Sequence, residues 1–338
     1  MARSGSERTT ATLPEVAAHA VETEGLRRTF DEMTAVDGID LAVAEGEIYG
    51  FLGPNGAGKT TVVRMLCTLL APSGGSARVA GFDVGADPGA VRLRIGVALQ
   101  DAALDDRQSG RELLRLQARL YGLSRADADT RIAEVGHIID QEAVDRLIGT
   151  YSGGMKRRLD LAAALVHNPQ VLFLDEPTTG LDPISRVAVW DEVRRLRADL
   201  GMTIFLTTQY LEEADVLADR VGIIDDGRLV AEGTPDALKR SVGSDLIVAE
   251  VEGDADSALL AVQGLDGVDA ASAHGGEITV RVGDGAALLS PVAVALAGSG
   301  LAVRNLTMRS PTLDDVFLSL TGDRLGDDAG AGTPTERE

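Results

Sequence analysis

The chain has 338 residues, of which 44% are hydrophobic and 25% are charged, a globular composition that excludes a fully disordered protein. Its length fits one domain of about 200 residues and a smaller one. The formal net charge of −21 disfavours bulk electrostatic binding to nucleic acid, so no nucleic-acid partner is expected. No apolar run approaches the roughly 18 residues of a membrane span, and residues 1–16 lack the apolar core of a secretory signal. With Cys67 as the only cysteine, we expect an intracellular protein without disulfides or a cysteine-based zinc site.

The first two thirds of the chain alternate between strand and helix patterns. We expect residues 1–18 to be a disordered tail. The hydrophobic pattern then predicts strands at two places within 39–52 and at 95–100, 171–175, 203–208, 220–225 and 228–232. It predicts helices at 59–70, within 110–148, and at 152–167, 184–200 and 211–218. The first of these helices is expected to end at Pro72 and the Gly74–Gly75 pair. This order indicates an α/β core interrupted by a helical insertion.

The pattern restarts after residue 243. It predicts strands at 245–251, 267–273, 277–282 and 301–308, and helices at 256–263 and 286–298. The order β-α-β-β-α-β is that of a ferredoxin-like α+β domain. A last amphipathic helix at 312–322 precedes a second expected disordered tail at 324–338. We therefore expect a nucleotide-binding domain at 19–242, with a helical subdomain at about 101–168, and a C-terminal accessory domain at 243–323.

Residues 53–60, GPNGAGKT, match the phosphate-binding pattern G-x-x-x-x-G-K-[ST] in full. The motif follows a predicted strand and opens a predicted helix, which is the context that the chemistry needs, because backbone N–H groups and the helix N-terminus then face an anion. Lys59 is expected to reach the β- and γ-phosphates of ATP, and the Thr60 hydroxyl to bind Mg²⁺. The predicted cofactor-binding residues of this loop are Gly53, Pro54, Asn55, Gly56, Ala57, Gly58, Lys59, Thr60 and Thr61.

Residues 171–177, VLFLDEP, form a buried strand pattern that ends in two acids. Asp175 is placed to hold Mg²⁺ directly or through water, because open α/β sheets bind ligands at the carboxyl ends of their strands. Glu176 is placed to accept a proton from an attacking water or to orient it. In isolation such an Asp-Glu pair is often only a solvated strand end.

Residues 151–158, YSGGMKRR, predict a second helix N-terminus suited to anions, with Ser152, Gly153 and Gly154 as candidate cofactor-binding residues. The chain has three lysines, and two of them, Lys59 and Lys156, lie in these two phosphate-seeking motifs. A bare Ser-Gly-Gly turn is weak evidence, but its order and spacing after the first motif strengthen it.

Together these motifs resemble those of an ATP-binding cassette (ABC) ATPase over about residues 20–240. GPNGAGKT resembles the Walker A motif, YSGGMKRR the signature, with Tyr151 where Leu is usual, and VLFLDEP the Walker B motif. The segments at 206–235 and 311–322 are similar to those of daunorubicin-resistance-type drug exporter ATPases. The resemblance implies a P-loop ABC ATPase core with a helical subdomain.

The same resemblance implies further site residues. Gln100 corresponds to the Q-loop glutamine at the metal, and Asp182 in GLD to the D-loop. Phe30 corresponds to the adenine-stacking aromatic, although a core Phe is the alternative. Gln209 stands where most cassettes have the catalytic His. Its amide can bond a γ-phosphate but cannot shuttle a proton.

By resemblance, two copies of the chain enclose two Mg-ATP, with the signature of one copy capping the ATP held by the other. Such a homodimer would drive a separate integral-membrane permease for drug or antibiotic efflux, docked near Gln100 and 101–123, from the cytoplasmic face of the membrane. A non-transport ABC ATPase, such as a ribosome-protection or regulatory factor, is the alternative, and a module that binds ATP without hydrolysing it is a third possibility. The intact Lys59, Asp175 and Glu176 argue against the last.

Two further expectations concern surfaces. Because two acidic protomers repel each other, we expect Lys59, Lys156, Arg157 and Arg158 to concentrate positive charge near the dimer interface. The C-terminal domain is expected to be an extra packing layer or dimer clamp, or else a regulatory or permease-contacting module that uses the apolar face of 313–320, formed by Leu313, Val316, Phe317 and Leu320.

Overall fold

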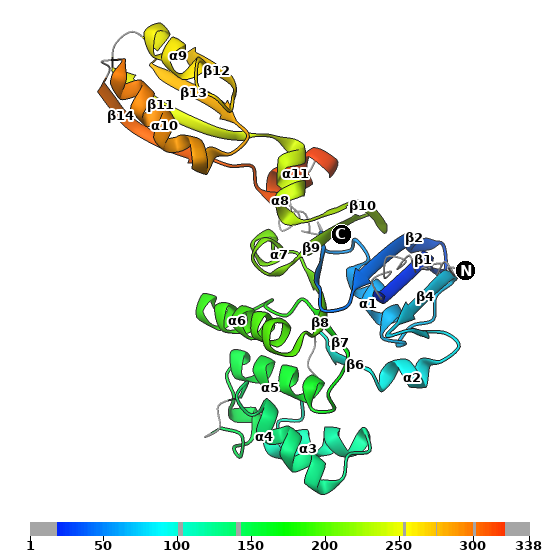
Figure 1. The fold of residues 1–338 in the computed structure, drawn as a ribbon. Coiled ribbons are helices and arrows are strands. Elements are labelled where there is room, and N and C mark those ends of the chain that lie inside the picture. Colours follow the sequence, from blue (N-terminus) through cyan, green and yellow to red (C-terminus); the bar gives the residue numbers. More distant parts are fainter. Residues whose placement is uncertain are drawn as a thin grey trace, which may run out of the picture.

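The computed structural model describes residues 19–100, 104–139, 143–252, 255–274, 276–299 and 302–321 (Figure 1). The tails expected at 1–18 and 324–338 lie outside the described residues. Within the described ranges, no helix is both long enough and apolar enough to cross a bilayer.

A six-stranded sheet in the order β10-β9-β3-β8-β7-β6 forms the centre of the molecule. All its neighbours pair in parallel except β9 and β10, which form an antiparallel edge. Its strands are β3 (Ile48–Leu52), β6 (Ile95–Ala98), β7 (Val171–Asp175), β8 (Thr203–Thr208), β9 (Arg220–Asp225) and β10 (Arg228–Gly233). Every residue of β3, β7 and β8 is buried, as expected of apolar runs in a sheet covered on both faces. The predicted α/β core is confirmed.

A second, antiparallel sheet in the order β2-β1-β4-β5 covers one side of helix α1 (Lys59–Leu66). Its strands are β1 (His19–Phe30), β2 (Met33–Ala44), β4 (Gly74–Val79) and β5 (Phe82–Asp83), and helix α2 (Pro88–Arg92) follows them. The sequence pattern did not predict β1, β4 or β5, because their outer faces are polar and bulges break the alternation.

Two predicted boundaries are wrong. Helix α1 ends at Leu66 rather than at residue 70, because Thr68 adopts a left-handed conformation with φ of 61°. The Gly74–Gly75 pair therefore starts a strand instead of ending the helix. Strand β6 ends at Ala98, two residues before the predicted end.

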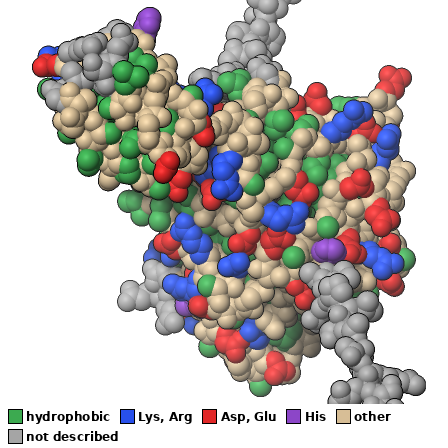
Figure 2. All heavy atoms as spheres, turned by 45° about the horizontal axis from the view of Figure 1, so that its top comes forward, with side chains coloured by type: hydrophobic (Ala, Val, Ile, Leu, Met, Phe, Trp, Pro, Cys, Tyr) green, Lys and Arg blue, Asp and Glu red, His purple; other side chains and the backbone are tan. Residues whose placement is uncertain are grey.

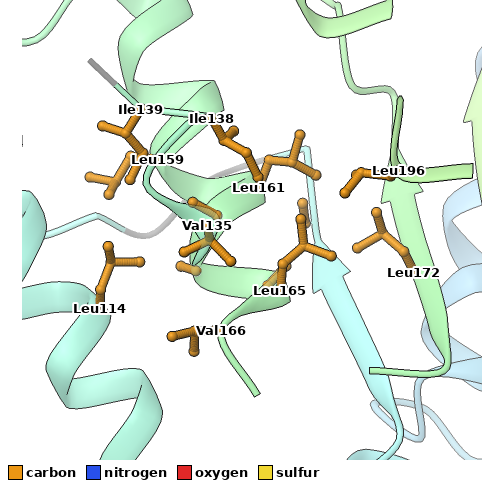
Figure 3. Packing of buried hydrophobic residues seen from close by; sticks show 14 of the residues in the cluster. Leu114, Val135, Ile138, Ile139, Leu159, Leu161, Leu165, Val166, Leu172 and Leu196 are labelled. Carbon is orange, nitrogen blue, oxygen red and sulfur yellow. The ribbon is translucent and has the colours of Figure 1, made fainter. Parts of the chain in front are cut away.

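The helical insertion reaches the central sheet through α5, which packs beside β6, while α3 packs on α4 and α5. It consists of α3 (Gly110–Leu120), α4 (Arg125–Val135), the 3₁₀ turn η1 (Ile148–Thr150) and α5 (Gly153–Leu165). Figure 3 shows α5 between two apolar contacts: Leu161 and Leu165 lie toward Leu172 of β7, whereas Leu159 lies toward Val135 of α4. Helix α5 is thus anchored by hydrophobic packing on both sides.

Three helices complete this part of the molecule: α6 (Pro183–Leu200), α7 (Leu211–Leu217) and α8 (Pro235–Val242). Acidic and basic side chains are interspersed on the face drawn in Figure 2, with no extended basic field there. This agrees with the net charge of −21.

A separate four-stranded antiparallel sheet in the order β12-β13-β11-β14 follows α8, with α9 and α10 packed on it (Figure 1). Its elements are β11 (Asp245–Glu252), α9 (Ala255–Gln263), β12 (Val268–His274), β13 (Glu277–Val282), α10 (Gly285–Gly298) and β14 (Ala302–Arg309). Counted within this unit, the strand order is 4-1-3-2, so the predicted ferredoxin-like arrangement is confirmed.

Helix α11 (Leu313–Thr321) returns to the central part of the molecule and packs on α7 and α8. Leu313, Val316 and Phe317 are buried there in a cluster that includes Leu52 of β3. Most of the apolar face expected at 313–320 therefore packs within the chain. Leu320 is the member of that face that remains exposed.

Candidate functional site

The loop at 53–58 joins β3 to α1 and approaches neighbouring backbone too closely for side chains at two positions. A Cβ atom at Gly53 would lie 2.3 Å from the Ile224 carbonyl oxygen, and one at Gly58 would lie 2.4 Å from that of Ala35. Gly58 also has a φ of 106°, which other residues rarely adopt. The Gly53 N–H donates to the Thr208 carbonyl, at 3.2 Å. Gly53 and Gly58 are thus required by backbone packing, and the loop opens helix α1 as a cradle for an anion.

Lys59 is the first residue of α1, and its ammonium turns back over the loop. It donates to the carbonyl oxygens of Gly53 and Pro54, at 2.8 and 3.0 Å. Burial lowers the pKa of Lys59, although the nearby charge of Glu176 opposes that shift. The lysine is therefore a desolvated cation held at the mouth of the cradle, where its attraction for a phosphate is strong.

Asp175 ends β7 directly beside the start of α1. Its Oδ1 accepts from the Thr60 hydroxyl at 3.2 Å and from the Thr207 hydroxyl at 2.6 Å. Its Oδ2 is buried and has no hydrogen-bond partner among the described residues. A buried carboxylate oxygen without a donor, next to a threonine hydroxyl, fits a hard divalent cation such as Mg²⁺.

Glu176 follows with a left-handed backbone, φ 47°, which is uncommon for a residue with a side chain. This conformation turns its buried carboxylate toward the P-loop. One oxygen, Oε1, lies 3.4 Å from the Lys59 ammonium, and the other accepts from Gln100 Nε2 at 3.2 Å and from the Thr179 hydroxyl at 3.3 Å. The structure thus brings the predicted residues Lys59, Gln100 and Glu176 into direct contact.

The signature residues form a separate group at the start of α5. Ser152 caps this helix by accepting from the Met155 N–H at 3.2 Å. A Cβ atom at Gly154 would lie 2.6 Å from the hydroxyl of Ser185 on α6. Among the described residues, no hydrogen bond or ion pair joins Ser152, Gly153 or Gly154 to the P-loop.

Asp182 of the D-loop belongs to this second group. Its side chain caps α6 by accepting from the N–H groups of Ile184 and Ser185, at 3.1 and 3.0 Å. It also accepts from the Ser185 hydroxyl at 2.6 Å, and these bonds lower the pKa of Asp182. Ser185 therefore links the D-loop to the signature helix.

Phe30 and Gln209 lie outside both groups. Phe30 ends β1, is 38% exposed, and carries the Arg28 guanidinium 4.5 Å from its ring centroid. It pairs with Met33 on β2, the strand whose Ala35 abuts the P-loop, so an exposed aromatic face is available near the cradle. Gln209 follows β8 and is partly exposed.

Two residues that the motifs did not single out, Thr207 and Glu213, complete the site together with Arg157 of the signature motif. Thr207 donates to Asp175, and Glu213 of α7 accepts from the Thr178 hydroxyl and from Trp190 Nε1, both at 2.9 Å. Arg157 binds backbone carbonyls around Glu176. The Thr-Thr pair that ends β8 and the Glu-Glu pair in α7 were visible in the sequence, but nothing local identified their partners.

Two of the four basic residues expected near the dimer interface have buried side chains. Lys59 and Arg157 are buried, with side chains 4% and 10% exposed, so neither contributes to an exposed basic patch. Lys156 pairs with Asp106 at 2.7 Å. The Arg157 guanidinium turns inward toward backbone carbonyl oxygens that the sequence pattern does not reveal.

A P-loop beside paired acids at a sheet edge, with a second phosphate-type motif on a helical insertion, defines an ABC-type ATPase. The comparisons with known proteins agree. A family model described as "ABC transporter" matches residues 36–179, and one described as "ATP-binding protein DrrA1-3-like, C-terminal domain" matches residues 233–321.

Relatives align along nearly the whole chain. Daunorubicin resistance ATP-binding protein DrrA2 of Streptomyces coeruleorubidus is 48% identical over 90% of this chain and 96% of its own. Daunorubicin/doxorubicin resistance ATP-binding protein DrrA of Streptomyces peucetius is 48% identical over 90% and 92% of the two chains. Linearmycin resistance ATP-binding protein LnrL of Bacillus subtilis is 35% identical over 91% and 100%. The chain therefore belongs to the ABC transporter ATP-binding subunits, in the group of the daunorubicin-resistance-type proteins, and it is an ATPase.

Solved structures are similar to the cassette part. One, described as an ATP-binding subunit of an ABC transporter, has a TM-score of 0.60 and 27% identity, over 66% of this chain and 92% of its own. The cbiO1 component of a Clostridium perfringens ABC transporter complex has a TM-score of 0.61 and 26% identity, over 65% and 90%. The predicted P-loop ABC ATPase fold is confirmed.

Proposed function

We propose that this chain is the ATP-hydrolysing subunit of an exporter, in which two copies close around two Mg-ATP and drive a separate membrane permease that expels drugs or antibiotics. The observation that carries the proposal is the convergence of Lys59, Gln100, Asp175 and Glu176 at the carboxyl edge of the central sheet. This arrangement combines a phosphate cradle, a cation site and a proton acceptor.

The P-loop would bind the β- and γ-phosphates through its N–H groups and through Lys59, which already lies over the loop. Phe30 would stack on adenine with its exposed ring face. The residues proposed to contact ATP in one copy are Phe30, Gly53, Pro54, Asn55, Gly56, Ala57, Gly58, Lys59, Thr60 and Thr61.

Thr60 and Asp175 would hold Mg²⁺, with Gln100 in reach of the same region through its contact with Glu176. Among the described residues, no cluster of three or more His, Cys, Asp or Glu side chains forms a metal site. The protein would thus contribute few ligands, as is usual for Mg²⁺ bound with phosphates. Bound Mg²⁺ withdraws charge from the phosphates and so stabilises the transition state.

Glu176 would accept the proton of the attacking water at a carboxylate oxygen. Its backbone is fixed by the hydrogen bonds of its N–H to the carbonyl and hydroxyl oxygens of Thr207, both at 3.1 Å, so the carboxylate is held in place before reaction. The Gln209 amide would bond the γ-phosphate, a role that requires no proton transfer.

A second copy would complete each site. Ser152, Gly153 and Gly154 form an anion-suited helix N-terminus that does not contact the P-loop of its own chain within the described residues, so a two-fold dimer would place it on the partner's ATP, with Asp182 beside it. Driving such a dimer from mostly open to mostly closed takes about 5 kcal/mol of differential binding. Several charge-assisted phosphate bonds supply this amount.

The names of the relatives, which concern daunorubicin, doxorubicin and linearmycin resistance, support efflux as the process that is energised. A permease would dock near Gln100 and the 101–123 segment, where helix α3 exposes Leu116 and Leu120. The chain would then work at the cytoplasmic face of the membrane.

The closed dimer is tested with the full chain and Glu176→Gln. Size-exclusion chromatography with light scattering should show an ATP-dependent dimer of the variant, with turnover reduced at least about hundredfold. Lys59→Ala should show neither a dimer nor turnover. Wild-type turnover in Glu176→Gln would remove Glu176 from the base role, and a monomer with ATP would contradict the two-copy site.

Transport is tested separately by co-expression with the membrane protein encoded next to the chain. Cells that carry both should lose a fluorescent anthracycline faster than cells that carry the Lys59→Ala subunit. Equal loss in both would favour a non-transport ATPase.

A further inference from the structure

The side chain of Arg157 binds three backbone carbonyl oxygens from two segments that surround the hydrolysis site. It lies on α5, one turn after the signature serine. Its Nη1 donates to Leu99 at 2.7 Å, its Nε to Pro177 at 2.9 Å, and its Nη2 to Asp175 at 3.1 Å. One guanidinium therefore joins the signature helix, the segment before Gln100 and the segment around Glu176.

Two of these carbonyls lie on either side of Glu176. Glu176 has a left-handed backbone, which is unfavourable for a residue with a side chain and persists only where its surroundings hold it. Arg157 binds the carbonyl of the residue before Glu176 and that of the residue after it. The Glu176 N–H donates to the carbonyl oxygen of Thr207 on the adjacent strand β8. The conformation that aims the carboxylate is thus held from both sides.

The third carbonyl belongs to Leu99, next to the glutamine that contacts Glu176. The hydrogen bond from Arg157 to the Leu99 carbonyl fixes the backbone next to Gln100. From this position, Gln100 Nε2 donates to Glu176 Oε2 at 3.2 Å. Arg157 therefore binds both main-chain segments whose side chains meet at the site, and among the described residues no hydrogen bond or ion pair joins it to either side chain.

The charge of Arg157 is only partly balanced. Its carboxylate partner is Asp160 on the same helix, at 3.3 Å. Burial lowers the pKa of the guanidinium, which nevertheless stays charged at neutral pH. A buried cation is unfavourable unless its N–H donors have acceptors. The planar guanidinium of Arg157 places three N–H groups on three separate carbonyl oxygens, a geometry that a lysine ammonium cannot reproduce.

Anchoring α5 does not require this arginine. The helix packs through Leu161 and Leu165 on the sheet side and through Leu159 on the other (Figure 3). At its far end, Arg131 of α4 donates to the carbonyls of Leu165 and Val166, at 3.1 and 3.2 Å. Arg131 is a purely structural counterpart of Arg157, remote from the phosphate cradle.

We propose that Arg157 is a positioning residue for hydrolysis. It fixes Glu176 by binding the backbone carbonyls on either side of that residue, and it fixes Gln100 by binding the carbonyl of the residue before it. The proposal rests on the base role proposed for Glu176. Because Arg157 sits on the helix that carries Ser152, any displacement of the signature is passed to the carbonyls around Glu176.

The test uses Arg157→Lys and Arg157→Met in the full chain, with Arg131→Lys as the matched control. We expect both Arg157 variants to lower kcat by about tenfold to hundredfold, since misplacing a catalytic group by about 1 Å costs this much. ATP affinity should stay within about threefold, because the P-loop is untouched. Arg131→Lys should lower the urea midpoint and leave kcat unchanged. Should Arg157→Met unfold, Arg157→Lys alone carries the test.

A double-mutant cycle separates positioning from general destabilisation. If Arg157 acts through Glu176, adding Arg157→Lys to Glu176→Gln should leave the residual turnover unchanged within about twofold. A tenfold further loss in that background, or an Arg157→Lys enzyme with wild-type kcat, would overturn the proposal. Wild-type turnover in Glu176→Gln itself would instead overturn the base role, so the two failures are distinguishable.

Discussion

The ammonium of Lys59 lies 3.4 Å from the carboxylate of Glu176, with both side chains almost completely buried, at 4% and 6% exposed. The cation that we propose binds phosphate and the carboxylate that we propose accepts a proton thus share one desolvated pocket. Removing either member leaves the other as an uncompensated buried charge. A substitution of Lys59 should therefore affect both nucleotide binding and the conformation of the site, whereas Glu176→Gln leaves the Lys59 charge available to a phosphate.

Lys59→Ala should weaken ATP binding by about tenfold to hundredfold, the worth of a charge-assisted hydrogen bond. Equilibrium titration with a fluorescent ATP analogue measures this loss. Lys239→Ala is the control, because Lys239 pairs with Asp215 and Asp236 on the surface and should not affect binding. Equal affinity of the Lys59 variant and wild type would exclude the phosphate role.

Asp175→Asn keeps an oxygen for the hydroxyls of Thr60 and Thr207 but removes the charge that a divalent cation needs. We expect at least about tenfold more Mg²⁺ to be required for half-maximal ATPase activity. ATP binding in the presence of a chelator should change little. An unchanged Mg²⁺ titration curve would contradict the cation site.

Glu213→Ala should destabilise the chain by about 2 kcal/mol, because it leaves the Thr178 hydroxyl and the Trp190 N–H unpaired in the interior. Burial raises the pKa of Glu213, so Glu213→Gln should cost less than about 1 kcal/mol. Trp190 is the only tryptophan, and its fluorescence reports urea unfolding directly. Glu212→Ala, at the exposed neighbouring residue, is the control, and equal loss in both Ala variants would exclude this network.

Asp160 should make stability depend on pH, because burial raises the pKa of its carboxyl from 3.8 to about 6. The folded state binds this proton more tightly than the unfolded chain, so the contribution is fully present below pH 3.8 and is lost as pH rises through about 6. Asp160→Asn should therefore gain stability relative to wild type across this window, on the order of 2 kcal/mol.

Urea unfolding at pH 4, 5, 6 and 7 measures the contribution of Asp160. The control is Asp191→Asn, which removes a similarly spaced pair with Arg194 that is exposed. A constant difference between Asp160→Asn and wild type over these pH values would show that Asp160 titrates normally.

Phe317→Ala should destabilise the central part of the molecule by about 3–5 kcal/mol, because Phe317 is 2% exposed where α11 meets α7 and α8. Leu320→Ala on the same helix should cost little, because Leu320 is 45% exposed. Thermal unfolding followed by Trp190 fluorescence compares them. Similar midpoints would show that α11 is not a packed part of this unit.

Much of the fold was predictable because the information is local. The unbroken apolar run at 171–175 predicts a doubly buried strand, and alternation after residue 243 predicts the ferredoxin-like order. The glycines of the P-loop motif likewise allow the local backbone conformation that the anion-binding loop needs. Periodicity does not report pairing partners, which is why the sheet formed by β1, β2, β4 and β5 was missed in part.

By itself, the sequence identified the groups that we propose carry the chemistry. The P-loop glycines, Lys59, Asp175 and Glu176 are defined by short motifs whose backbone geometry is local. Only the tertiary structure decided how those groups are held. Arg157 lies in a motif suggestive of an exposed basic surface, yet its guanidinium turns inward to carbonyls of two other segments. The hydrogen-bond acceptors of a long side chain depend on which polar groups lie within its reach in the folded protein. The carbonyls that bind Arg157 come together only once the strands of the central sheet are assembled.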